Sequence, residues 1–452
     1  MHQSCNIGGR WLAAFLLLAG GSLLHAGNNN NVNGFRSNSV GGVSINAEGV
    51  VGQAAETDRR NWLKYLRQQM QQVRPELRQA SNLRMISLRQ LDEAIRKAQA
   101  AGQELSDEMR YLAGLQRIQY VFVYPEKNDV VIAGPGEGWI VNQGGTVVGE
   151  TTHRPVLLLD DLLVALRSVD AARTEGITCS IDPTPEGRQA FDNVIRRQRT
   201  FSPRVTQALS HAMGHQEVTI TGVPADSHFA RVLVAADYHM KRLAMHLDPT
   251  PLPQTPSFLT LLQKRGQLPG TATPRWWLAC NYEPLACSED RLSWELRGPG
   301  VKAMTENEIV QQDGQIQGTG RQDPIAQIWS ENMTKNYHEL AKHQPVFQEL
   351  RNAMDMCVVA ALISKNRLLE KAGCQLPALA GKNSNLEIES WHTPKKIATQ
   401  CSFIKVRRNY VITASGGVEV ESWDVAANTQ VVPAVGQVRA KAAQSAATWW
   451  WN

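Results

Sequence analysis

Two stretches of the chain repeat their hydrophobic positions with the period of an amphipathic helix. In residues 87–102, Ser87 is placed to cap the start, Gln90 completes a capping box, and Gly102 marks the end. Residues 229–247 show the most regular helical period, at about 100° per residue. Its apolar stripe consists of Phe229, Val232, Leu233, Ala236, Met240, Leu243, Ala244 and Leu247. We therefore expect a helix over each stretch.

Another helix is expected from Pro345 to Lys365. Its second half is apolar on nearly all sides, but it is only about half as long as the roughly 20 residues that a membrane span requires. The pattern therefore predicts a buried core helix.

Short β-branched and aromatic runs after residue 119 indicate strands. YVFVYP, VVIAGP, WIVN and TVVGE are separated by polar or glycine-rich turns, which predicts an antiparallel meander. Further strands are expected in RWWLACNY, SWELR, VKAM and NEIVQQDGQIQG, the last with Asp-Gly at a hairpin tip. ATQCSFIKVRR and YVITASGGVEVESW continue this pattern towards the end of the chain.

The order of these elements predicts an α+β fold. It has an N-terminal helical section, a mixed central body with antiparallel strands and a β-rich C-terminal piece. We divide the chain into a signal peptide (1–26), a flexible Asn/Gly-rich lead (27–56), a helical section (57–115), a central α+β domain (116–265), strand pairs plus a helical hairpin (266–380) and a β-rich C-terminal piece with a Trp tail (381–452).

The first 26 residues have the pattern of a cleavable export signal. Arg10 precedes the apolar run Trp11–Leu24, and Ala26 is a suitable residue for signal peptidase. The run is shorter than the roughly 20 apolar residues of a transmembrane helix. We expect cleavage after Ala26 and a mature chain without a membrane span, located in the periplasm, cell envelope or extracellular space. An uncleaved anchor helix is the alternative interpretation.

Composition changes this picture little. The chain is 42% hydrophobic and 20% charged, which is typical of a globular protein, and its net charge of +5 is too small to indicate nucleic-acid binding. Six cysteines remain after the predicted cleavage, an even number that permits disulfides in an exported protein. Cys280 and Cys287 enclose a short loop, NYEPLA, and form the predicted local disulfide.

Four stretches of the sequence resemble a domain family found in exported proteins of planctomycete-type bacteria. They are QYVFVYPEKNDVVIAGPGEGW, RVLVAADYHMKRLAMHL, RWWLACNY and NYHELAKHQPVFQELRNAMDMCVVAALI. The likeness covers residues 85–366. Because that family has no assigned function, the resemblance implies export and a shared architecture, and it supplies no catalytic residues.

Several polar residues are of types that can take part in chemistry. His211 and His215 have the spacing of a shared metal site, but the glutamate of a His-Glu-x-x-His motif is missing and Gly214 is expected to end the helix between them. Two surface or cap histidines are therefore the preferred interpretation. Asp237 and Lys241 are expected to form a structural ion pair one helical turn apart. Asp160 and Asp161 are interpreted as a helix cap.

The tryptophans offer an indication of binding. Trp276 and Trp277 are adjacent in one predicted strand, so one should enter the core and the other should lie on the opposite face. Trp449, Trp450 and Trp451 follow a stretch with few bulky apolar residues. This tail is expected either to dock or to adhere to a partner, and its Ala-rich lead favours adhesion.

The sequence contains neither a Gly-x-Ser-x-Gly elbow nor a phosphate-binding glycine loop in a strand-to-helix setting, and it predicts no cofactor. It favours an exported, non-catalytic envelope or extracellular protein that binds an envelope protein or polysaccharide. The alternative is an extracytoplasmic hydrolase with a site assembled from distant residues, for which Asp237, His215 and Glu283 are candidates. A deep pocket with convergent titratable groups would favour the hydrolase.

Overall fold

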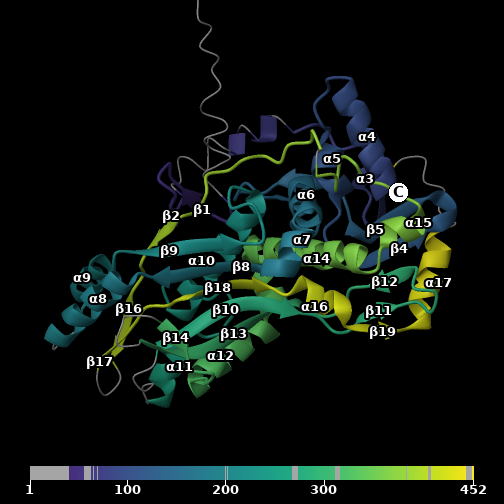
Figure 1. The fold of residues 1–452 in the computed structure, drawn as a ribbon. Coiled ribbons are helices and arrows are strands. Elements are labelled where there is room, and N and C mark those ends of the chain that lie inside the picture. The colour runs from purple at the N-terminus through teal and green to yellow at the C-terminus, as the bar shows by residue number, and fades with distance from the viewer. Residues whose placement is uncertain are drawn as a thin grey trace, which may run out of the picture.

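The computed structural model describes residues 40–54, 63–64, 66–68, 70–198, 200, 202–266, 273–310, 316–382, 384–405, 409–443 and 450–452. The predicted signal peptide, half of the predicted lead and Trp449 lie outside these residues. The described part is an α+β fold with antiparallel and mixed sheets, as the sequence predicts (Figure 1).

The larger sheet contains nine strands, and several neighbours in it are far apart in the sequence. In spatial order these are β1 (Val43–Ile45), β2 (Val50–Gln53), β15 (Lys396–Ala398), β9 (His215–Thr221), β8 (Ile177–Pro183), β18 (Gly416–Val420), β10 (Thr273–Asn281), β13 (Gly300–Val310) and β14 (Ile316–Gly318). The late strand β18 is antiparallel to β8 and parallel to β10. The middle of this sheet therefore joins three distant parts of the chain.

The smaller sheet contains six strands. They are ordered β19 (Thr429–Val431), β11 (Leu285–Cys287), β12 (Ser293–Glu295), β4 (Tyr120–Tyr124), β5 (Asp129–Gly136) and β3 (Ser81–Ser87). The predicted meander is only partly observed. Strands β4 and β5 pair as expected, whereas WIVN and TVVGE form a separate two-stranded ladder, β6 (Trp139–Val141) with β7 (Val147–Gly149). The remaining ladder pairs β16 (Ser402–Lys405) with β17 (Asn409–Ile412).

The outer edge of β3 is covered by the last three residues of the sequence. The Ser87 amide donates to the carbonyl of Trp450 over 2.8 Å, and the Asn452 amide donates to the carbonyl of Met85 over 3.2 Å. The indoles of Trp450 and Trp451 are only 5% and 7% exposed. The expectation of an adhesive tail is therefore wrong for these two residues, because their side chains are packed against the protein.

Helices fill the space around the sheets. They are α3 (Pro75–Arg78), α4 (Leu88–Ala100), α5 (Asp107–Arg110), α6 (Leu159–Arg167), α7 (Val169–Glu175), α8 (Pro185–Arg197), α9 (Pro203–Met213), α10 (His228–Ala244), α11 (Phe258–Arg265), α12 (Pro324–Lys335), α13 (Tyr337–His343), α14 (Pro345–Lys365), α15 (Leu368–Ala372), α16 (Ser422–Ala427) and α17 (Pro433–Ala442), with short 3₁₀ turns at Leu112–Gly114 and Pro125–Lys127. None of the helices in the described residues is long and apolar enough to span a bilayer.

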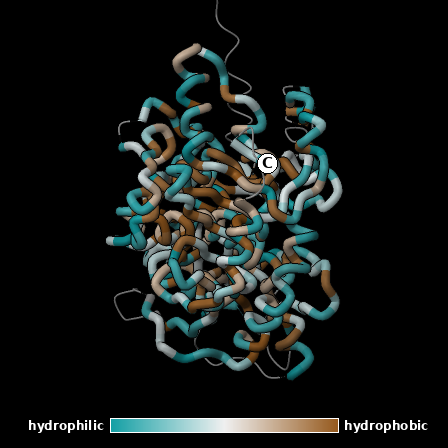
Figure 2. Tube along the Cα trace, turned by 90° about the vertical axis from the view of Figure 1, so that its right-hand side faces the viewer, coloured by the Kyte–Doolittle hydropathy of each residue, from teal (hydrophilic) through white to brown (hydrophobic). Residues whose placement is uncertain are grey.

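Helix α14 is the centre of the main core, as its apolar sequence predicts. It packs against α6, α10, α13 and α16, and nearly all its residues after Val346 are buried. Helix α10 confirms the predicted periodicity and is buried beyond the predicted stripe. Figure 1 shows α10 and α14 on one side of the large sheet, with α11 and α12 on the other. Hydrophobic segments gather in the interior of the molecule (Figure 2).

The predicted Cys280–Cys287 disulfide is wrong in this structure. Both residues are buried, free cysteines. Cys280 lies in β10 of the large sheet, whereas Cys287 lies in β11 of the small sheet. The short loop between them carries the chain from one sheet to the other, so the spacing in the sequence does not bring the two thiols together.

Candidate functional site

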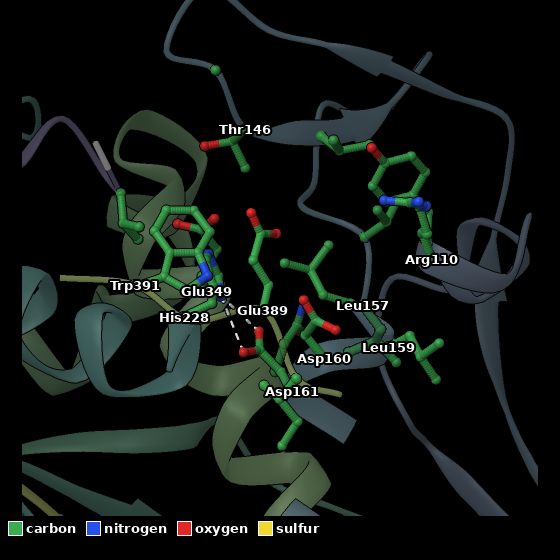
Figure 3. A pocket seen from close by; sticks show the side chains of 18 of the residues that line it. Arg110, Thr146, Leu157, Leu159, Asp160, Asp161, His228, Glu349, Glu389 and Trp391 are labelled. Carbon is green, nitrogen blue, oxygen red and sulfur yellow. Dashed lines mark hydrogen bonds and ion pairs between the residues drawn. The ribbon is translucent and has the colours of Figure 1, made fainter. Parts of the chain in front are cut away.

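A pocket of about 580 Å³ lies where α6, α10 and α14 meet two loops and the β6–β7 turn (Figure 3). Its volume is within the usual range of about 300–1,000 Å³ for small-molecule sites. The polar side chains that line it are Arg110, Tyr111, Thr146, Asp160, Asp161, His228, Glu349, Asn352, Glu387, Glu389, Ser390 and Trp391. They come from segments far apart in the sequence, and the helix packing brings them to one cavity.

The first turn of α6 supplies two carboxylates. Asp160 and Asp161 follow Leu159, and the cap residue of this helix is Leu158, which makes no side-chain cap. The interpretation of the two aspartates as a helix cap is therefore wrong. They are still well placed electrostatically, because negative charge is favourable at the positive end of a helix dipole. Both line the pocket.

Asp161 is paired with His228, the first residue of α10. The Nδ1 atom of His228 lies 3.0 Å from each Asp161 carboxylate oxygen, and both residues are buried. Burial alone would lower the pKa of His228, but the negative charges of Asp161, Glu349 and Asp160 together outweigh it and raise this pKa to about 9. At neutral pH the imidazole is therefore protonated.

The second ring nitrogen of His228 remains available to a ligand. With Nδ1 held by Asp161, no residue that the structure describes forms a hydrogen bond with Nε2. The ring lines the pocket, as Figure 3 shows. An imidazolium with one fixed nitrogen and one accessible N–H is a positioned hydrogen-bond or proton donor.

Glu349 lies on the second turn of α14 and lines the same part of the pocket. Burial raises its pKa to about 7, and the nearby positive charge of His228 only partly opposes this effect. Its Oε2 atom is buried without a hydrogen-bond partner among the described residues. A carboxyl group that is partly protonated near neutral pH can both donate and accept a proton during a reaction.

Asp160 is the second carboxyl group with a pKa close to neutrality. Burial raises its pKa to about 6, and the negative charges of Glu389 and Asp161 add to the increase. The positive charges of His228 and Arg110 act in the other direction, and Figure 3 shows Arg110 on the side of the pocket away from His228. The pocket thus holds two carboxyl groups of different pKa around one protonated histidine, an arrangement typical of sites that transfer protons.

Trp391 closes one side of the site. Its ring makes an edge contact with His228, with centroids 5.4 Å apart, and the guanidinium of Arg231 lies 5.1 Å from the Trp391 ring centroid. Arg231 is only 2% exposed, and its three side-chain nitrogens have no hydrogen-bond partner among the described residues. Burial lowers the pKa of Arg231 to about 9. The cation–π contact is thus its principal polar interaction here.

The predicted catalytic candidates do not form a site. Asp237 is fully buried in α10 and lies 2.8 Å from Lys241, which confirms the predicted ion pair. His215 is exposed at the start of β9, and Glu283 is exposed in the loop between β10 and β11. None of these candidates lines the pocket.

The predicted metal candidates are also separated from this chemistry. His211 is exposed on α9, and His215 begins the next strand after Gly214. Among the described residues, no group of three or more His, Cys, Asp or Glu side chains is arranged to hold a metal ion.

The tryptophan pair in β10 is divided between environments, as predicted. Trp276 is fully buried and makes edge contacts with Phe258 of α11 and Trp329 of α12. Trp277 is partly exposed, and the guanidinium of Arg275 lies 5.9 Å from its ring centroid. Little aromatic surface is therefore left for a partner at these positions.

The comparisons with known proteins give a match to one family model over part of the chain, and no activity. Residues 179–258 match the family model described as "Protein of unknown function (DUF1598)". This match runs from β8 through α10 and includes His228 but not Asp161, Glu349 or Trp391. Searches of curated proteins and of solved structures found no match.

Proposed function

We propose that this protein is an exported hydrolase with its acid–base site in the pocket between α6, α10 and α14. The observation that carries the proposal is the Asp161–His228 pair beside Glu349. It places a protonated imidazole and a carboxyl group with a pKa of about 7 at one cavity. This corresponds to the alternative function raised by the sequence, with a different set of residues.

Each group has a role in this proposal. Asp160 accepts a proton from a water molecule while the water oxygen forms a bond to the electrophilic atom of the substrate. Glu349 donates its proton to the leaving group as the bond to that group breaks. His228 donates a hydrogen bond from Nε2 to the substrate oxygen on which negative charge develops, and Asp161 keeps this imidazole charged and oriented. The two carboxyl groups then exchange protons with solvent.

Export is the part of the proposal that rests on the sequence. The apolar run Trp11–Leu24 followed by Ala26 supports removal of residues 1–26 and action in the periplasm, envelope or extracellular space. N-terminal sequencing of the protein purified from its host should find a chain that begins near Gly27. A chain that begins at Met1 would contradict export by this route.

A non-catalytic binding protein is the competing function. Exposed tryptophans would favour it, but Trp276, Trp450 and Trp451 are buried. A pocket lined by several titratable groups fits the hydrolase better. The two functions differ in turnover, which can be measured directly.

Turnover can be tested with the mature chain and three classes of chromogenic substrate, namely p-nitrophenyl esters, p-nitrophenyl glycosides and aminoacyl p-nitroanilides. We expect one class to be hydrolysed. We expect kcat/KM to fall below pH about 6, where Asp160 is protonated, and above pH about 7, where Glu349 loses its proton. Glu349→Gln should lower kcat by about a hundredfold or more, because it removes the proton donor.

Glu370→Gln is the matched control, since Glu370 is an exposed carboxylate on α15 outside the pocket. Circular dichroism and the melting temperature verify that each variant is folded. If the folded mature chain hydrolyses none of the three classes between pH 5 and 8, or if both variants retain full activity, the hydrolase proposal is wrong.

A further inference from the structure

Basic residues are concentrated in three segments of the sequence. Residues 193–216, 249–282 and 390–418 together contain twelve Lys or Arg and no Asp or Glu. The net charge of the whole chain is only +5, so the rest of the chain is net negative. Such a separation of charge within one chain indicates a surface for a partner of opposite sign.

The fold brings parts of these three segments to one end of the molecule. Helices α8 and α9 pack against each other, and Leu209 and Met213 of α9 share a hydrophobic cluster with Cys401 and with Val411 of β17. Helix α11 contacts β16. Figure 1 shows these five elements together at the lower left of the molecule, away from α6 of the pocket.

The ends of these elements carry exposed basic side chains. Two lie in the last turn of α8, one in the first turn of α9, two in the last turn of α11 and one at the end of β16. They are Arg196, Arg197, Arg204, Lys264, Arg265 and Lys405, and we call them the basic end. Helices α9 and α11 and strands β16 and β17 contain no Asp or Glu, and the two acidic residues of α8 precede its last turn.

Stabilisation of the helices accounts for only part of the basic end. Positive charge is favourable in the last turn of a helix, which explains the basic residues of α8 and α11. Arg204 has the opposite position, because it lies in the first turn of α9, where negative charge is favourable. That turn contains no acidic residue, and Arg204 follows Arg196 and Arg197 after a short connection. Its charge therefore favours an anionic partner over the isolated fold.

We propose that the basic end binds an anionic lipid surface. None of its six residues lines the 580 Å³ pocket, and they belong to four different elements. A small ligand requires a concave site, whereas a lipid surface offers many negative headgroups to separate side chains at once.

Phe403 is the observation that favours lipid over an acidic polysaccharide. It is partly exposed and belongs to none of the hydrophobic clusters that the described residues form. Phe403 and Lys405 are two positions apart in β16, so their side chains lie on the same face of the strand. An aromatic ring beside basic residues can enter the boundary between headgroups and acyl chains. This inference does not rest on the proposed hydrolase.

Vesicle co-sedimentation with the mature chain tests the inference. We expect the protein to sediment with vesicles that contain about 30% phosphatidylglycerol and to stay in solution with vesicles of phosphatidylcholine alone. Raising the salt concentration from about 50 mM to about 500 mM should weaken this binding by at least about tenfold, because exposed charges are screened. Soluble alginate, an acidic polysaccharide, is the competing probe.

The triple variant Arg196→Gln, Arg197→Gln, Arg204→Gln should weaken the partition onto the anionic vesicles by about a hundredfold, at about fivefold for each residue. The matched control is Lys97→Gln, Lys371→Gln, Lys382→Gln, which removes three exposed positive charges from other elements and should leave the partition unchanged. Circular dichroism verifies that both variants are folded. Equal binding to the two kinds of vesicle, an equal loss in the two variants, or binding to alginate without binding to the anionic vesicles would overturn the inference.

Discussion

Removing the charge of His228 should abolish a stability change between pH 7 and 9 that is visible in the unmodified protein. His228 is 7% exposed and bonded to Asp161. Its pKa is raised in the folded protein from 6.5 to about 9. A group whose pKa is raised by folding stabilises the folded state fully below its unfolded pKa, and this contribution is lost as the pH rises through its folded pKa.

The magnitude follows from these two pKa values. At about 1.4 kcal/mol per pH unit, the interval between 6.5 and about 9 corresponds to a total of about 3 kcal/mol. The free energy of unfolding should therefore fall by about 1.4 kcal/mol per pH unit through the middle of this interval. Asp160, with a pKa of about 6, titrates mostly below this interval, and Glu349, with a pKa of about 7, contributes only at its lower end, so the fall between pH 8 and 9 reports His228.

Urea denaturation at half-unit steps from pH 6.5 to 9.5 measures this dependence. The unmodified mature chain should lose stability with rising pH, while His228→Asn should start lower and show a flatter profile. His211→Asn is the control, because His211 is exposed on α9 and should leave the slope unchanged. If His228→Asn and the unmodified chain have parallel profiles, the imidazole does not carry the charge that we assign to it.

Three further predictions concern residues outside the pocket. Trp451→Ala should lower the free energy of unfolding by about 3 kcal/mol, because the 7%-exposed indole leaves a cavity against β3; an unchanged melting temperature would contradict docking. Asp237→Asn should cost about 3 kcal/mol in urea denaturation, since it leaves the buried ammonium of Lys241 unpaired, and a cost near zero would refute the ion pair. Cys280 and Cys287 should both react with iodoacetamide in denaturant without reductant, and mass spectrometry showing either one protected would restore the disulfide.

Local signals in the sequence predicted single elements well. Ser87 caps α4 by accepting a hydrogen bond from the Gln90 amide, as the capping box indicates, and the regular stripe at 229–247 corresponds to α10. These features depend on residues within one or two helical turns. The choice of strand partners does not depend on residues so close in the sequence. Nothing in YVFVYP indicates that β4 pairs with β12, more than 160 positions later, so the meander was only partly correct.

The candidate site could not be predicted in the same way. Asp161, His228 and Glu349 come together only through the packing of three helices, and their pKa values depend on that burial. One signal was present in the sequence. Asp160 and Asp161 interrupt the apolar run VLLLDDLLVAL, and carboxylates inside an apolar helix require a partner or a ligand. The cap interpretation accounted for their position and overlooked that requirement.

The docking of the last three residues on β3 has a consequence for the order in which the chain is made. Met85 and its partner Asn452 are separated by 367 positions, so β3 is synthesised long before the backbone that covers its edge. Until then the strand presents unpaired amides and carbonyls, which are a template for pairing with another chain. Ribosomes that translate this message together would hold many copies in that state. Loss of residues 450–452 would make it permanent, and such a product should accumulate as aggregate even though its pocket is intact.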